Sequence, residues 1–241
     1  LDTCGFEKDA FYFYKSVWNQ KEKFAYLCPH WNLKLEKGTV LPVICYTNCE
    51  DAELFVNGRS FGMKSKGFPC YGMTERYGHF DRYRRPANTD DLFLSWDVPY
   101  EPGKIEVVGY HDGKEVCRYN VETTGEAASI KLTVDKTSVD ADGRSIVQAE
   151  VRIVDSEGRL VFNACPELDF TLEGDAKIIG IDNGDPACHE QWKETKGRHA
   201  FNGMAYAVIR AGQNKGELTL TVQASGVDAA IGKASVTISQ K

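Results

Sequence analysis

Apolar residues near the start of the chain recur at helical spacing. Phe6, Ala10, Phe13, Tyr14 and Val17 fall on one stripe of a helix, which predicts a helix over residues 6–18. Three further aromatic residues add apolar area around it: Phe11, Tyr12 and Trp18. A helix with aromatic side chains on most sides needs other parts of the protein to bury them.

From about residue 38 the apolar period changes from 3.6 to 2, which is typical of strands. Asn57-Gly58 and Asp112-Gly113 separate pairs of such runs, and both dipeptides suit the positive φ angles of two-residue hairpins. Pro102-Gly103 supplies another turn. Strands joined by hairpins, with no helices between them, predict an antiparallel sandwich. The runs are TVLPVICYT, AELFV, LFLSWDV, KIEVVGY and KEVCRYNVETT.

Residues 123–128, TTGEAA, have the small and polar composition of a linker, and a second strand pattern begins after them. In residues 145–155, apolar side chains alternate with Gln148, Glu150 and Arg152, as in a half-buried strand. About seven such runs in roughly a hundred residues match the size of an immunoglobulin-like sandwich. We therefore predict an all-β chain with two immunoglobulin-like antiparallel sandwiches in tandem, at 24–124 and 125–241, after a short helical segment at 1–23.

Composition and charge exclude several classes of protein. Hydrophobic residues make up 42% and charged residues 27%, which is ordinary for a globular protein. The 35 acidic and 29 basic residues give a net charge of −6, which disfavours nucleic acid as a partner. No apolar run reaches the roughly 18 residues of a membrane span. The first residues lack an initiating Met and the features of a signal peptide, so we expect an internal segment of a longer protein.

The residues favour neither a metal site nor a cofactor. The eight cysteines include no CxxC pair, and Cys45 and Cys49 would lie about 13 Å apart on one extended strand, too far to bridge. We expect most cysteines to be small buried residues or free thiols. The oxygen-rich segments 140–143 and 182–185 have no glutamate at the twelfth position of a calcium loop, so we interpret them as turns.

Three groups of segments resemble a known family. Residues 2–18, DTCGFEKDAFYFYKSVW, resemble the end of the (β/α)8 barrel of family 2 glycoside hydrolases, where the last strand leads into the last helix. CPHWN, followed by VICYTNCEDAELFVNGRSFG, resembles the sandwich that comes after the barrel in bacterial β-galactosidases. VDADGRSIVQAEVRIVDSEGR, IIGIDNGDP and RHAFNGMAYAVIR resemble the next, immunoglobulin-like domain. The resemblance covers essentially the whole chain in the right order.

The resemblance implies that the chemistry lies elsewhere. Family members are retaining hydrolases with two glutamates on the barrel, an acid/base and a nucleophile, about 5 Å apart. Both positions would precede Leu1, so we expect no catalytic residue here and no turnover by the chain alone. The implied partner is the catalytic barrel, with oligosaccharide and a second copy of the chain as further candidates. The family also implies export to the periplasm or cell surface of a bacterium, with the cytoplasm as the alternative.

Two places in the chain are candidates for carbohydrate binding. At His30, Trp31 and Asn32, the indole offers a flat face for a sugar ring and its neighbours offer hydrogen bonds; alternatively Trp31 wedges barrel against sandwich and His30 caps a turn. Trp192 offers a sugar platform or, alternatively, an anchor for its loop. Residues 74–86 interleave arginines with aromatic rings, but Glu75 and Asp81 interrupt them, which favours a solvated or packing loop over nucleic-acid binding.

Three functions remain in competition. The chain is a scaffold that buttresses the barrel and shapes its cleft, a carbohydrate-binding module of the same enzyme, or an adhesin-like array of immunoglobulin domains. The aromatic helix disfavours the adhesin, and the lack of an aromatic row spaced for a sugar chain favours the scaffold. We also expect helix 6–18 to cover its apolar faces against a sandwich or a second copy of the chain.

Overall fold

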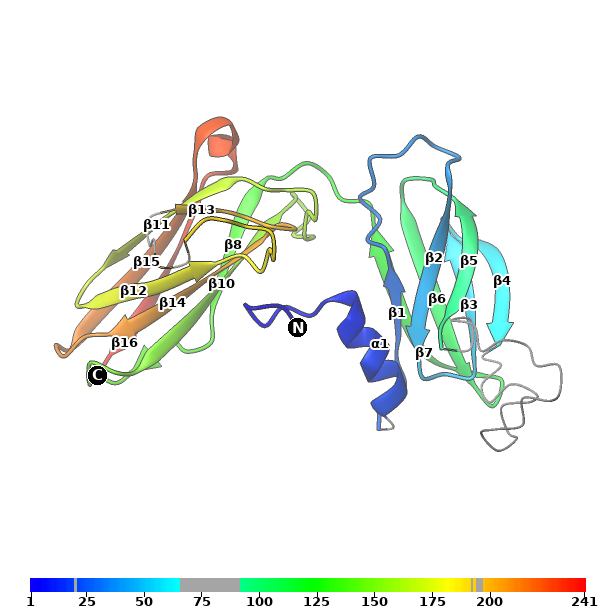
Figure 1. Ribbon diagram of the computed structural model, residues 1–241, viewed down its shortest axis with the longest axis horizontal. Coiled ribbons are helices and arrows are strands. Elements are labelled where there is room, and N and C mark those ends of the chain that lie inside the picture. Colours follow the sequence, from blue (N-terminus) through cyan, green and yellow to red (C-terminus); the bar gives the residue numbers. More distant parts are fainter. Residues whose placement is uncertain (20, 66–91, 192, 194–196) are drawn as a thin grey trace. The chain divides into compact units, whose positions relative to one another are not determined.

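The computed structural model describes residues 1–19, 21–65, 92–191, 193 and 197–241, and the chain folds as two compact units (Figure 1). Residues 7–123 form one unit, called here the first sandwich. Residues 1–6 and 124–241 form the other, called the second sandwich. The two antiparallel β-sandwiches predicted from the sequence are confirmed. The predicted segment 1–23 is divided between the two units, because its first six residues belong to the second sandwich.

The first sandwich contains two sheets, ordered β1-β2-β5 and β4-β3-β6-β7, with every pairing antiparallel. Its strands are β1 (Ala25–Cys28), β2 (Val40–Thr47), β3 (Asp51–Val56), β4 (Arg59–Ser65), β5 (Leu94–Pro99), β6 (Lys104–His111) and β7 (Lys114–Glu122). The two sheets enclose one apolar core, to which Leu54, Trp96 and Val107 contribute.

Both predicted hairpins of the first sandwich are present. Asn57 (φ 49°) and Gly58 (φ 80°) join β3 to β4, and Asp112 (φ 50°) and Gly113 (φ 69°) join β6 to β7. Positive φ at both central positions matches the twist of the flanking strands, and asparagine, aspartate and glycine tolerate it best. The turn chemistry therefore fixes the pairing of these strands.

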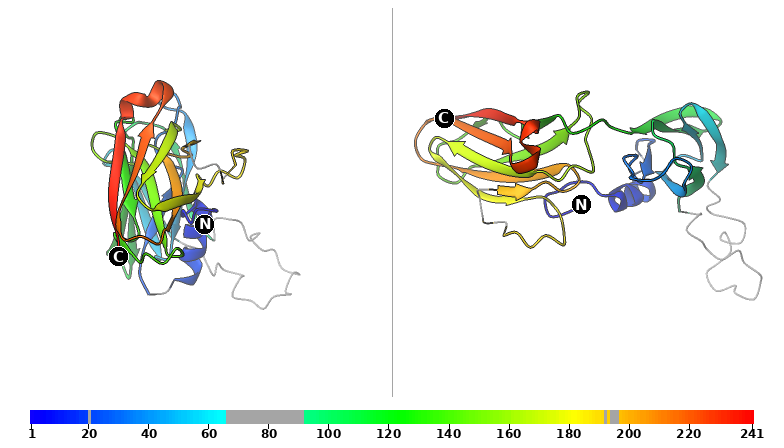
Figure 2. Two further views of the ribbon diagram at one scale, coloured as in Figure 1. Left: turned by 90° about the vertical axis from the view of Figure 1, so that its left-hand side faces the viewer. Right: turned by 90° about the horizontal axis from the view of Figure 1, so that it is seen from above.

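The second sandwich has sheets ordered β12-β14-β10-β8 and β13-β11-β15-β16-β9. All pairings are antiparallel except that of β16 with β9, which is parallel. A short 3-10 helix precedes the last long strand (red in Figures 1 and 2). The elements are β8 (Ser129–Val134), β9 (Ser138–Val139), β10 (Ile146–Val154), β11 (Glu167–Glu173), β12 (Ala176–Asp182), β13 (Gly197–His199), β14 (Met204–Ala211), β15 (Gly216–Ala224), η2 (Gly226–Ile231) and β16 (Lys233–Gln240).

Alternation along β10 and β15 explains how the second core forms. Side chains at every second position of these strands point inward and are fully buried, as the sequence pattern predicts. They meet the inner faces of β11, β14 and β16 in a single cluster that is separate from the core of the first sandwich. The fully buried positions on the two strands are Val147, Ala149, Val151, Ile153, Leu218, Leu220, Val222 and Ala224.

Asp155, just after β10, holds the start of the second sandwich. Its side chain is fully buried and accepts hydrogen bonds from the backbone nitrogens of Gly125 (3.0 Å), Glu157 (3.0 Å) and Arg159 (2.9 Å). The Arg159 guanidinium completes the shell, with Nη2 2.7 Å from the carboxylate. Burial alone would raise the pKa of Asp155, but these donors outweigh it and hold the pKa below its usual range. Asp155 therefore anchors the predicted linker, residues 123–128, to the second sandwich through the backbone of Gly125.

The one α-helix among the described residues, α1 (Asp9–Trp18), begins three residues later than the apolar pattern predicts. Phe6 is held outside the helix because its backbone nitrogen donates to Asp2 Oδ1 (2.9 Å) within a tight turn. No helix in the part of the chain that the structure describes is long and apolar enough to cross a membrane.

Candidate functional site

Residues 1–6, called here the N-terminal segment, form a compact turn. The Asp2 carboxylate accepts hydrogen bonds from the backbone nitrogens of Cys4 (2.9 Å) and Phe6 (2.9 Å), and Gly5 adopts a positive φ of 85°. The backbone of Asp2 closes the turn by donating to the carbonyl of Phe6 (3.1 Å). The segment therefore has a defined shape of its own.

The N-terminal segment lies against the second sandwich, beside the yellow segment of Figure 2. Thr3 Oγ1 donates to Asp182 Oδ2 (3.1 Å), and the ring of Phe6 meets that of Tyr206 edge to face, with centroids 6.0 Å apart. Phe6 is buried, and a Cβ at Gly184 would collide with the Asp2 carboxylate. The sandwich thus provides hydrogen bonds, an aromatic contact and a glycine that makes room.

Asp182 belongs to a set of polar residues called here the Asp182–Arg198 cluster: Asp182, Asn183, Glu190, Arg198 and His199. Arg198 is only 4% exposed, although it carries a charge. Its Nη2 lies 3.1 Å from Asp182 Oδ1, and its Nη1 donates to the carbonyl of Glu190 (3.0 Å). A buried charge needs such partners, so Arg198 ties β12 to β13 across the long connection between them.

Hydrogen bonds link the remaining members of the cluster to one another. Asn183 Nδ2 donates to the carbonyl of His199 (2.9 Å), and His199 Nδ1 lies 2.7 Å from Glu190 Oε1. Burial alone would raise the pKa of Glu190, but its contacts with His199 hold the pKa below the usual range. A general acid needs a raised pKa, so this arrangement suits an electrostatic clamp better than acid catalysis.

Burial also changes the chemistry of Cys4 in the N-terminal segment. It raises the pKa of the Cys4 thiol to about 12, helped by the negative charges of Asp182 and Asp2. A thiol with such a pKa stays protonated at neutral pH and is a poor nucleophile. Cys4 therefore contributes packing to this contact and has no reactive role there.

Trp31, predicted as a sugar platform or a packing wedge, is fully buried in the first sandwich. Its Nε1 donates to the carbonyl of Glu101 (2.9 Å), and its ring lies 5.1 Å from that of Tyr100. Its own carbonyl accepts a hydrogen bond from Thr123 Oγ1 (3.0 Å). A covered indole has no free face for a sugar, so this geometry fits a packing role within the sandwich.

The neighbours of Trp31, His30 and Asn32, also have contacts that fit a structural role. His30 Nδ1 accepts a hydrogen bond from the backbone nitrogen of Asn32 (3.2 Å), which is the turn-capping geometry. Asn32 is buried, and burial lowers the pKa of the half-buried His30. The other predicted candidates, Trp192 and the arginine-rich loop 74–86, lie outside the described residues.

One face of α1 packs on the first sandwich. The ring of Tyr12 stacks on Tyr26 with centroids 3.7 Å apart, and the Tyr26 hydroxyl donates to Asp9 Oδ1 (2.7 Å). Phe13 meets Tyr46 edge to face at 5.6 Å. These contacts cover the helix along the outer face of β1 and β2.

The opposite face of α1 is exposed. Trp18 is 73% exposed, Tyr14 50% and Val17 49%. The expectation that the helix covers its apolar faces is thus met on one side only. An exposed aromatic patch on a short helix marks a surface that binds another apolar surface.

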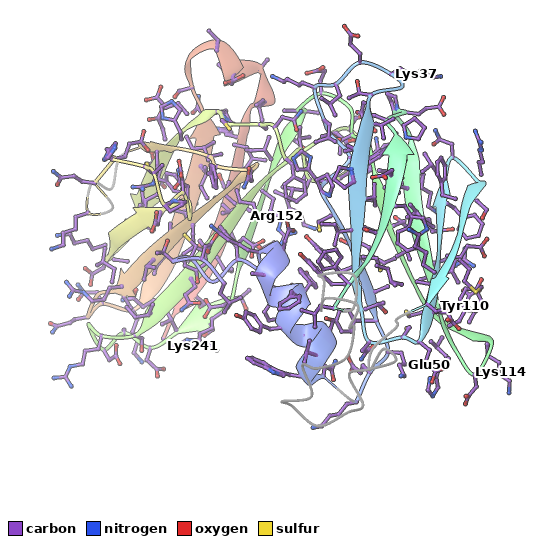
Figure 3. The ribbon with its side chains drawn as sticks, turned by 45° about the vertical axis from the view of Figure 1, so that its right-hand side comes forward. Lys37, Glu50, Tyr110, Lys114, Arg152 and Lys241 are labelled. Atoms are coloured by element: carbon purple, nitrogen blue, oxygen red, sulfur yellow. The ribbon has the colours of Figure 1, made fainter. Side chains whose placement is uncertain are left out.

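The part of the chain that the structure describes contains one group with ligand atoms close enough for a metal ion: Glu50, His111 and Asp112. His111 Nδ1 lies 3.0 Å from Glu50 Oε1, and Glu50 lies near Tyr110 and Lys114 of the β6–β7 hairpin (Figure 3). Glu50 and Asp112 are largely exposed, and exposed carboxylates of this kind pair with histidine without a metal. In the segments at 140–143 and 182–185, Asp142 and Asn183 instead accept hydrogen bonds from nearby backbone nitrogens.

The chain matches two family descriptions. Residues 130–232 match glycoside hydrolase family 2 C-terminal domain 5, which corresponds to most of the second sandwich. Residues 38–117 match a domain of unknown function, DUF4982, which corresponds to most of the first sandwich. The Asp182–Arg198 cluster falls inside the first match and Trp31 falls just before the second.

Two similar proteins extend the comparison to nearly the whole chain. The chain is 34% identical over 240 residues to the β-galactosidase BoGH2A of Bacteroides ovatus, covering 98% of the chain and 25% of that protein. It is 32% identical over 216 residues to a putative β-glucuronidase of Formosa agariphila, covering 88% of the chain and 19% of that protein. The chain thus spans a quarter or less of the length of these relatives.

A solved structure gives the same result. A family 2 glycosyl hydrolase from Bacteroides cellulosilyticus superposes with a TM-score of 0.85 at 26% identity, covering 100% of the chain and 31% of that structure. Both sandwich sequences, their order and their fold therefore agree with one family. The chain belongs to glycoside hydrolase family 2 and corresponds to the C-terminal region of its β-galactosidases and β-glucuronidases.

Proposed function

We propose that this chain is the non-catalytic support of a retaining family 2 enzyme that hydrolyses β-galactosides, and that it braces the catalytic barrel and shapes the rim of its cleft. Support for the substrate comes from BoGH2A, the β-galactosidase that is similar over nearly the whole chain. The putative β-glucuronidase of Formosa agariphila, at 32% identity, makes β-glucuronides the second candidate.

The observation that carries the scaffold role is the N-terminal segment. By its resemblance, it links the last strand of the barrel to the last helix. Segments that follow barrel strands lie on the face where barrel enzymes hold their active sites. Because Thr3 and Phe6 contact Asp182 and Tyr206, the second sandwich holds one loop of that face in place. Asp182 is therefore a positioning residue.

The helix supplies a second point of support. α1 packs on the first sandwich through Tyr12 and Phe13. Its other face, with Tyr14, Val17 and Trp18, stays exposed and is the surface that we assign to the barrel. Two sandwiches thus hold two consecutive pieces of the same chain segment, which limits how far the neighbouring active-site loop moves.

The test uses the full-length enzyme that contains this chain. Asp182→Asn removes the charge that pairs with Arg198 and weakens the acceptor for Thr3. We expect kcat/KM for a chromogenic β-galactoside to fall about tenfold, because small displacements of a positioned loop are costly to catalysis. Asp140→Asn, in an exposed turn of the same sandwich, is the matched control and should leave kcat/KM unchanged.

Three results would contradict the proposal. Unchanged kcat/KM in Asp182→Asn would remove the positioning role. Turnover of the galactoside by the 241-residue chain alone would show that it contains its own catalytic residues. Faster turnover of a chromogenic β-glucuronide than of the galactoside by the full-length enzyme would transfer the substrate assignment to the second candidate.

A further inference from the structure

Two cysteines far apart in the sequence meet in the first sandwich. Cys49 lies in the connection between β2 and β3, and Cys117 lies on β7, 68 positions later. Their Sγ atoms are 3.5 Å apart. This sulfur–sulfur contact lies in the sandwich whose Glu50 and Tyr110 are marked in Figure 3.

A glycine makes room for this contact. Gly109 on β6 pairs directly with Cys117 across the sheet. A Cβ built at Gly109 would lie 2.6 Å from the Cys117 sulfur and 2.7 Å from the Cys49 sulfur. Both sulfurs therefore occupy the space that any other residue at 109 would fill with its side chain.

The surroundings hold Cys49 in place. Cys49 is 2% exposed, and its backbone nitrogen donates to Thr47 Oγ1 (3.0 Å), which in turn donates to the carbonyl of Phe24 (2.6 Å). Cys117 is only partly buried. Cys49 is thus fixed inside the sandwich, whereas part of Cys117 is exposed to solvent.

We propose that Cys49 and Cys117 form a reversible disulfide, which makes the first sandwich a site of oxidative modification by small disulfides of the glutathione class. A disulfide requires an S–S distance of about 2.05 Å, so the two sulfurs must approach by about 1.5 Å, which side-chain rotation provides. The bond would link the β2–β3 connection to β7 and close a loop of the chain that contains β3, β4, β5 and β6.

The chemistry balances as a thiol–disulfide exchange. The thiolate of Cys117 attacks one sulfur of glutathione disulfide and releases glutathione, which takes up a proton. The thiolate of Cys49 then attacks the Cys117 sulfur of the mixed disulfide and releases the second glutathione. The two cysteines lose two electrons and two protons, and one glutathione disulfide becomes two glutathione molecules.

The thiolate of Cys117 is scarce at neutral pH. Its contact with Cys49, followed by burial, holds the pKa of the Cys117 thiol above the usual range. Since only the thiolate attacks, the exchange should accelerate as the pH rises. The reaction is therefore slow and selective, and fits a structural cross-link better than a rapid catalytic cycle.

The test oxidises the whole chain with glutathione disulfide, blocks remaining thiols with iodoacetamide and maps the cysteines by mass spectrometry. We expect the chain to lose two of its eight thiols and to yield a linked peptide pair that contains Cys49 and Cys117. Oxidation should also raise the urea midpoint of the first sandwich, because the bridge closes a long loop in the unfolded chain. Dithiothreitol should reverse both changes.

Three variants separate this bridge from general oxidation. Cys117→Ser should remove the linked pair and the effect of dithiothreitol on the urea midpoint. Cys165→Ser, at an exposed position, is the matched control and should retain both. Gly109→Ala, whose Cβ would separate the sulfurs, should slow cross-linking at least tenfold. The proposal fails if wild-type Cys49 and Cys117 remain alkylated after oxidation, or if Cys49 links instead to Cys45 or Cys70.

Discussion

Replacing Trp31 with alanine tests whether this residue packs or binds sugar. The side chain is fully buried, so all of its roughly 200 Å² of mainly apolar surface leaves water on folding. At about 25 cal/mol per Å² this is worth up to about 5 kcal/mol, and measured Trp→Ala costs of about 3–5 kcal/mol agree. We therefore expect Trp31→Ala to lower the free energy of unfolding of the first sandwich by about 4 kcal/mol.

The assay is urea unfolding of the chain, followed by circular dichroism, together with titration of galactose and lactose. Trp18→Ala is the matched control, because Trp18 is 73% exposed and its loss should leave stability unchanged. The stability of Trp31→Phe should lie between those of Trp31→Ala and Trp18→Ala, since this variant keeps an aromatic ring but loses the hydrogen bond to the carbonyl of Glu101. The reasoning is refuted if the free energy of unfolding of Trp31→Ala lies within about 0.5 kcal/mol of that of the parent chain. It is also refuted if Trp31→Ala abolishes sugar binding without loss of stability.

Two further predictions concern the second sandwich. Because the folded-state pKa of Asp155 lies below its usual 3.8, the stabilisation that its charge provides is complete above that pH and is lost as the pH falls further. Urea midpoints from pH 7 to pH 2.5 should therefore fall more in the parent chain than in Asp155→Asn, which keeps only the losses from other carboxylates with a lowered pKa, such as Glu190. Gly203→Ala should destabilise more than Gly158→Ala in thermal unfolding. Both glycines have positive φ, but only at Gly203 would a Cβ lie 2.6 Å from the carbonyl oxygen of Val161. Equal melting temperatures would contradict this.

Local pattern was enough to predict most of the fold. The hairpins at Asn57-Gly58 and Asp112-Gly113 depend on neighbouring residues alone, so sequence reasoning found both. The buried faces of β10 and β15 follow from strict alternation. The start of α1 was predicted three residues early, because the apolar stripe continues to Phe6 while the Asp2 carboxylate holds Phe6 outside the helix.

The pattern of apolar and polar residues could not predict contacts between residues far apart in the sequence. Asp182 was interpreted as part of a turn, but it is the last residue of β12, and its role depends on Arg198, sixteen positions later, and on Thr3. Arg198 lies in β13, a strand of three residues that the apolar pattern did not predict, so no signal in the sequence pointed to this pair. Trp31 left two interpretations open because burial depends on Tyr100 and Thr123, which are distant in sequence.

The division of the chain has a consequence for the order of its maturation on the ribosome. Residues 1–6 emerge before the first sandwich but complete their contacts only with partners near residues 182–206, whereas the described strands of residues 7–123 pair only with one another. The inserted unit is therefore able to reach its native state while the outer unit is still being synthesised. Until then Phe6 has no Tyr206 to cover it, and the N-terminal segment lacks the partners that hold it.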